Sequence, residues 1–144
     1  MKLKKNRKNL KNKVVTGFMV GAMMAMAVTP VFANNYHDSD FAFNFGNGYW
    51  QTTPERVKED DSYVYMNCTS SNTPGDSYDA YVWGWDTDDN RDFETGGPYT
   101  YYEGTIRKMT NYVYENDGDY AYIKARHSGA GDGVFSGLWS PDSI

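Results

Sequence analysis

From Phe41 onwards, the chain repeats short runs in which aromatic or apolar residues occupy every second position. In Phe41–Phe45, phenylalanine alternates with alanine and asparagine. In Ser62–Cys68, Val64, Met66 and Cys68 alternate with two tyrosines and an asparagine. A two-residue period places the two sets of side chains on opposite faces of a β-strand. This pattern predicts an all-β fold, because no segment shows the longer period of an amphipathic helix beyond two turns.

Six to eight such runs are separated by segments rich in glycine, proline, serine, asparagine and aspartate. The predicted strands cover residues 41–45, 49–53, 62–68, 78–85, 99–103, 106–114, 120–126 and 134–139. Their spacing is near the 8–12 residues typical of a sandwich or barrel. Asp117-Gly118, between two of the runs, predicts a hairpin turn. We therefore expect one domain over 34–144, a small antiparallel β-sandwich.

The interior of this domain is expected to be aromatic. After residue 33, Leu138 is the only leucine, whereas all 13 tyrosines and four tryptophans are present. One group of rings suggests either an exposed face that stacks on sugars or part of the core. Its members are Tyr81, Trp83, Trp85, Tyr99 and Tyr101. The shortage of aliphatic residues favours the core interpretation.

Residues 1–33 have the order of a cleavable secretory signal peptide. Seven basic residues precede an uncharged apolar run, and Val31-Phe-Ala33 follows the break at Pro30. This order is typical of a segment removed after Ala33. A retained membrane anchor is the alternative, but several Gly and Ala make the run weakly hydrophobic. We expect a secreted domain that contacts a membrane only transiently, through the signal peptide.

The expected mature domain is strongly acidic. Seven of the 14 basic residues lie within residues 1–33, whereas all 19 acids lie after it, which leaves a net charge of −12. Such a surface repels nucleic acid and anionic lipid, and cations, basic peptides or neutral sugars fit it better. Cys68 is the only cysteine, so no internal disulfide is expected. A buried thiol is favoured over pairing between chains.

An acidic segment suggests a calcium site. Oxygen-bearing side chains alternate at Asp86, Asp88, Asn90, Asp92 and Glu94. This spacing suits a hard cation such as Ca²⁺. The sixth position is Arg91 where an EF-hand requires glycine, so the segment is not an EF-hand. A solvated acidic loop that protects a sheet edge is the favoured alternative, and no other cofactor is expected.

The sequence offers little for catalysis. His37 and His127 are the only histidines. A catalytic thiol triad would consist of Cys68, His127 and Asp132. The local sequence around them has no nucleophile, zinc or phosphate-binding motif. We predict a protein that is not an enzyme and has no catalytic residues.

The ends of the predicted domain resemble a known family. Phe41–Phe45, Gln51–Thr53, Lys124–His127 and the closing Ser136–Ser143 resemble small, secreted, uncharacterised proteins of Gram-positive bacteria that share a domain of unknown function. The arrangement of a signal peptide followed by a small β-domain is also distantly similar to that of lactococcin 972-type bacteriocins. This similarity implies a β-sandwich. The resemblance implies no catalytic residues. In the closing segment, Trp139 is expected to anchor the core and Ser-Pro-Asp to form a turn.

Together these observations predict a secreted, non-enzymatic β-domain of a Gram-positive bacterium. The expected role is bacteriocin-like antagonism or binding to a component of the cell envelope. The alternatives are a carbohydrate- or wall-binding module and a divergent secreted hydrolase.

Overall fold

The computed structural model of the protein describes residues 36–129 and 131–143. The predicted signal peptide lies outside these residues. The described part contains nine strands and one short 3-10 helix, η1 (Phe45–Asn47). It contains no helix long and apolar enough to cross a membrane.

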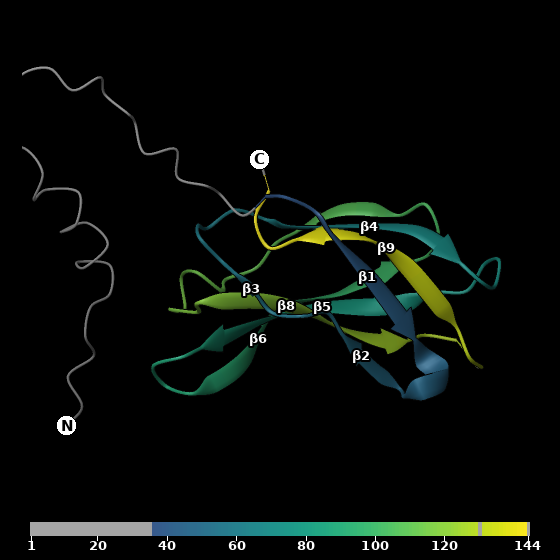
Figure 1. The fold of residues 1–144 in the computed structure, drawn as a ribbon, viewed down its shortest axis with the longest axis horizontal. Coiled ribbons are helices and arrows are strands. Elements are labelled where there is room, and N and C mark those ends of the chain that lie inside the picture. Colours follow the sequence, from purple (N-terminus) through teal and green to yellow (C-terminus); the bar gives the residue numbers. More distant parts are fainter. Residues whose placement is uncertain (1–35, 130, 144) are drawn as a thin grey trace, which may run out of the picture. The chain divides into compact units, whose positions relative to one another are not determined.

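The strands form two antiparallel sheets that pack face to face (Figure 1). Sheet A has the order β1 (Ser39–Asn44), β9 (Val134–Ser140), β4 (Val64–Ser71) and β7 (Ile106–Met109). Sheet B has the order β2 (Trp50–Thr52), β8 (Tyr120–His127), β5 (Tyr78–Asp86) and β6 (Arg91–Tyr101), and β3 (Arg56–Val57) also pairs with β8. The predicted all-β sandwich is confirmed.

The two-residue period generates the core between the sheets. In β5, Tyr78, Ala80 and Val82 are fully buried, while the residues between them are half-buried on the other face. The core is largely aromatic, as predicted: the Tyr78 and Tyr101 rings stack with their centroids 5.5 Å apart. Large rings bury a large apolar area each, and this compensates for the scarcity of aliphatic side chains.

The predicted hairpin at Asp117-Gly118 is wrong. The preceding strand, β7, ends at Met109 in sheet A, whereas β8 belongs to sheet B, so residues 110–119 connect the two sheets. Asp117, not Gly118, has a positive φ, of 63°. Gly118 is required for space, because a Cβ there would lie 2.6 Å from Val113 Cγ1. Turn chemistry is local and does not determine which sheet the next strand joins.

The predicted acidic loop, 86–94, is also shorter than expected. Residues 87–90 form a tight turn, and β6 then continues from Arg91 through Gly96, Gly97 and Pro98 to Tyr101. Gly97 and Pro98 both lie opposite Tyr81, where the register shifts. Because β6 is an edge strand, a bulge with proline is tolerated there.

Candidate functional site

The outward-facing side of β5 carries large rings that the core does not need. Tyr81, Trp83 and Trp85 are half-buried on the outer side of sheet B. The expectation that they belong to the core is therefore wrong, whereas Tyr101 is fully buried as predicted. The other face of β5 already supplies the core, and a strand offers only one of its two faces to the interior.

Strand register brings these rings into rows with residues of β2 and β8. Trp50 lies opposite Arg126, which lies opposite Asp79. In the next rows Lys124 lies opposite Tyr81, and Tyr122 opposite Trp83. We call the resulting surface the aromatic face; it consists of Trp50, Tyr81, Trp83, Tyr122, Lys124 and Arg126.

Two cations lie among the rings of the aromatic face. Lys124 Nζ is 4.5 Å from the ring centroid of Trp83 and 5.1 Å from that of Trp50. The Arg126 guanidinium carbon is 5.8 Å from Trp50 and 6.0 Å from Tyr81. A cation over an aromatic ring is attracted by the electron density of its face. The cations therefore hold rings from β2 and β5 against strand β8.

Hydrogen bonds fix the borders of the aromatic face. Arg126 pairs with Asp79 at 3.3 Å, and the Asp79 carboxylate also accepts a hydrogen bond from Thr100 Oγ1 at 2.8 Å. Tyr122 donates its hydroxyl proton to Asp92 Oδ2 at 3.1 Å. Burial, then the hydrogen bond to Asp92, raises the pKa of Tyr122 above its ordinary value. Tyr122 therefore remains a neutral donor at any physiological pH.

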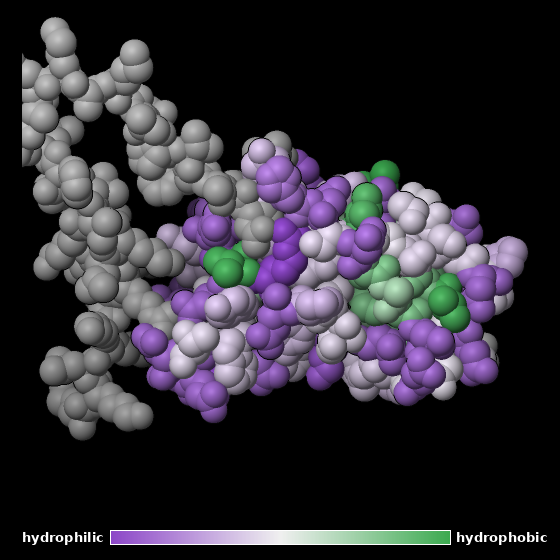
Figure 2. All heavy atoms as spheres, viewed as in Figure 1, coloured by the Kyte–Doolittle hydropathy of each residue, from purple (hydrophilic) through white to green (hydrophobic). Residues whose placement is uncertain are grey.

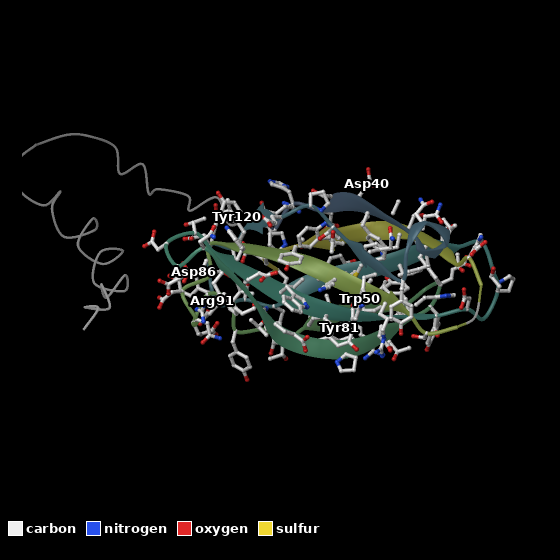
Figure 3. All side chains as sticks on the ribbon, turned by 90° about the horizontal axis from the view of Figure 1, so that it is seen from below. Asp40, Trp50, Tyr81, Asp86, Arg91 and Tyr120 are labelled. Carbon is white, nitrogen blue, oxygen red and sulfur yellow. The ribbon has the colours of Figure 1, made fainter. Side chains whose placement is uncertain are left out.

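One end of the aromatic face is open to solvent. Trp50 is 43% exposed and the adjoining Tyr49 is 59% exposed. The Trp50 and Tyr81 rings are 5.7 Å apart, and Figure 3 shows these two residues next to each other on the sheet. The side of the molecule seen in Figure 2 has small groups of hydrophobic residues separated by hydrophilic ones. Exposed rings of this size are typical of recognition surfaces.

The candidate calcium ligands lie around the β5–β6 turn and along β6. Asp86 is buried, and its Oδ1 accepts hydrogen bonds from the backbone N–H groups of Asp88 and Asp89 at 3.0 and 3.3 Å. Its Oδ2 lies 3.8 Å from Arg91, and Figure 3 shows this pair at one end of the sheet.

Asp92 and Glu94 lie farther along β6, opposite Trp85 and Trp83. Among residues 36–129 and 131–143, no three His, Cys, Asp or Glu side chains form a group that could hold a metal ion. Calcium binding by Asp86, Asp88, Asn90, Asp92 and Glu94 stays a prediction.

The residues considered for a thiol triad have other contacts. Both carboxylate oxygens of Asp76 lie within 3.0 Å of His127 Nε2, and the imidazole stacks on Phe45 with centroids 5.1 Å apart. The Cys68 thiol is buried and donates to the carbonyl of Ser70 at 3.8 Å. The acid that orients His127 is therefore Asp76 and not Asp132.

The closing segment holds a polar site that sequence reasoning missed. Trp139 is fully buried, as predicted for a core anchor. Three residues later, Asp142 forms an ion pair with Lys58 at 2.7 Å, and both side chains are completely buried. No local pattern relates these two residues, because they are 84 positions apart.

No curated protein and no solved structure matches this chain significantly. A protein-family model does match it over residues 29–143, which include all nine strands of the β-sandwich and the closing segment. That family is described as a protein of unknown function (DUF2712). The match covers most of the chain, and the protein therefore belongs to the DUF2712 family.

Proposed function

We propose that this protein is a secreted, non-enzymatic binding module of the cell envelope, and that its aromatic face binds a neutral glycan. The observation that carries this proposal is the exposed Trp50 ring beside Tyr81, held by Arg126 and Lys124. A pyranose ring has an apolar face of C–H groups, and a flat aromatic surface of matching size buries that face from water.

The aromatic face is suited to this role because its rings are already positioned. Lys124 lies between the indoles of Trp50 and Trp83, and Arg126 lies beside Trp50 and Tyr81. Ordering a side chain during binding costs free energy, and a site that is ordered beforehand avoids this cost. The rings and cations together thus favour a rigid ligand with an apolar face.

Charge favours a neutral sugar over an anionic polymer. The chain after residue 33 carries a net charge of −12, and Arg126 is already paired with Asp79 at the site. Asp79 and Arg126 offer an acceptor and donors for hydroxyl groups, the usual polar contacts of a small-molecule site. A polyanion would face repulsion from the surrounding carboxylates.

Secretion is supported by the predicted signal peptide, residues 1–33, and a Gram-positive source by the resemblance described above. A bacteriocin-like role rests on that resemblance and on the shared β-sandwich alone. The aromatic face therefore favours envelope binding, and growth inhibition of related bacteria is the assay that would favour antagonism instead.

The test is sedimentation of the protein with insoluble polysaccharides, including purified peptidoglycan and a neutral plant polysaccharide. Trp50→Ala is expected to weaken binding about tenfold or more, equivalent to at least about 1.4 kcal/mol. Tyr102→Ala is the matched control, since Tyr102 is 55% exposed and lies outside the aromatic face. Equal binding by both variants, or release of sugars from the polysaccharide, would contradict the proposal.

A further inference from the structure

Lys58 and Asp142 form a contact that joins the two sheets. Lys58 directly follows β3 of sheet B, and Asp142 follows β9 of sheet A. Lys58 Nζ lies 2.7 Å from Asp142 Oδ1, and neither side chain is exposed to solvent. Burying two opposite charges costs much of the free energy that their attraction returns, so this pair needs more explanation than stability.

Two backbone carbonyls orient the Lys58 nitrogen. Nζ lies 2.6 Å from the carbonyl oxygen of Ser62 and 2.7 Å from that of Pro141. The Ser62 carbonyl is itself held by Asn111 Nδ2 at 3.1 Å. A neutral amine has two N–H groups and one lone pair. If the two N–H groups are donated to these two carbonyls, the lone pair is directed at the Asp142 carboxyl group.

The Asp142 carboxyl group is also held in place. Its Oδ2 accepts a hydrogen bond from the backbone N–H of Glu59 at 3.2 Å. The Asp142 carbonyl accepts one from Ser140 Oγ at 2.8 Å, and the following N–H, that of Ser143, donates to Ser62 Oγ at 3.1 Å. An N–H group aimed at Oδ2 stabilises negative charge that develops on this oxygen when a nucleophile attacks the carboxyl carbon.

A second carboxyl group lies next to the pair. Asp60 Oδ1 accepts a hydrogen bond from the backbone N–H of Ser62 at 2.9 Å, and the carbonyl of Ser62 accepts one from Lys58 Nζ. Partial burial alone would raise the pKa of Asp60, but hydrogen bonds from Ser62, the Lys58 charge and the contact with Asp142 together lower it below its ordinary value. Asp60 is thus an ionised base beside the reacting groups at neutral pH.

We propose that Lys58 and Asp142 condense spontaneously to an intramolecular amide, a covalent cross-link between sheets A and B. One proton passes from the Lys58 ammonium to the Asp142 carboxylate along the 2.7 Å contact. The neutral amine then attacks the Asp142 carboxyl carbon, the C–N bond forms, and Asp60 accepts the second proton from Nζ. Asp60 returns that proton to the departing hydroxyl oxygen, the C–O bond breaks, and one water molecule leaves.

The reaction needs no oxidant, metal or energy source, because an ion pair becomes an amide and water. Burial promotes it in two ways. A site without water favours the neutral amine and acid over separated charges, and the fold holds nucleophile and carbon together, which replaces a bimolecular encounter. This inference is independent of the proposed glycan binding.

The test is tryptic digestion of the folded, purified full chain followed by mass spectrometry under denaturing conditions. An amide at Lys58 blocks cleavage there, so residues 57–91 should appear joined to residues 127–144, with a mass lower by one water than the sum of the two peptides. Fragment spectra should place the branch at Lys58 and Asp142. Separate peptides 59–91 and 127–144 after prolonged incubation of the folded protein would overturn the proposal.

Two variants separate the roles of the residues. Asp142→Asn retains a carbonyl carbon, and expulsion of ammonia should give a branched peptide of the same mass; its absence in a folded variant would count against attack at this carbon. Asp60→Asn retains the ion pair but lacks the base, and the branched peptide should form more slowly. An unchanged rate would overturn the assignment of proton transfer to Asp60. Circular dichroism verifies that each variant has folded.

Discussion

The two sheets have similar inner faces and different outer faces. Both inner faces are lined by rings and small apolar side chains that form a single core. Outward positions in sheet A carry mostly small or polar side chains such as Ser136 and Asn67, with Tyr65, Ile106 and Leu138 as the large exceptions. Outward positions in sheet B carry the aromatic face, with its cations between the rings.

This difference separates what the fold requires from what it permits. An antiparallel sandwich needs one apolar face per sheet, and its other faces are free to be polar. Sheet A follows this rule at most of its outward positions. Sheet B places tryptophan and tyrosine where serine or threonine would serve, and the packing of the core does not explain that choice. The outer face of sheet B is therefore the region where a function is expected.

The largest expected effect comes from the inner face of sheet A. Trp139→Ala should lower the free energy of unfolding by about 3–5 kcal/mol, because it leaves a cavity between the sheets. Its neighbour Leu138 points outward, and Leu138→Ala should cost no more than about 1 kcal/mol. Urea denaturation of both variants measures the contrast. Equal losses would contradict the placement of Trp139 in the core and of Leu138 on the outer face of β9.

The next effect compares outward positions in the two sheets. Trp83→Ala should cost about 1–2.5 kcal/mol, since it removes the ring contact with Tyr122 and the cation–π contact with Lys124. This is more than the loss expected for Leu138→Ala in sheet A. The same denaturation series provides the measurement. A smaller loss for Trp83→Ala than for Leu138→Ala would mean that the aromatic face is not a packed unit.

A loss of stability at alkaline pH is expected from Cys68, on the inner face of sheet A. Burial raises the pKa of its thiol above the ordinary value of 9.0. Near and above pH 9.0, the thiol ionises more readily in the unfolded chain than in the folded one, so the free energy of unfolding falls as pH rises through this range.

Cys68→Val lacks this thiol. From pH 8 to pH 10, its free energy of unfolding should therefore fall by less than that of the original protein, whatever the difference between the two proteins at pH 8. Denaturation of both proteins at the two pH values tests this. Parallel losses would indicate that the native thiol ionises as readily as the unfolded one.

The smallest effect concerns calcium at the end of sheet B. A site with a dissociation constant equal to the calcium concentration would stabilise the protein by about 0.4 kcal/mol. Millimolar Ca²⁺ should then raise the melting temperature slightly more than NaCl of equal ionic strength, which relieves charge repulsion by screening alone. Asp88→Asn combined with Asp92→Asn should abolish the difference. Identical effects of the two salts would indicate that this segment is a solvated acidic turn and does not bind calcium.

The strands were largely predictable because their signal is local. The period of two in Ser62–Cys68 and Tyr78–Trp85 identified both strands and the residues that share each face. The prediction that aromatic residues fill the core is confirmed at Tyr101 and Trp139, which are fully buried. The period cannot say which face of β5 is the inner one, and the pattern therefore predicts the wrong side for Tyr81, Trp83 and Trp85.

The strand period, the acidic charge and the aromatic character of the interior follow from the sequence alone, since each is a property of neighbouring residues or of composition. The three-dimensional fold is needed to show that residues 110–119 pass between sheets, that β2 places Trp50 beside Arg126, and that Lys58 contacts Asp142. These pairings depend on which strands become neighbours. That choice results from packing two sheets around one core, and no local pattern encodes a contact between residues 84 positions apart.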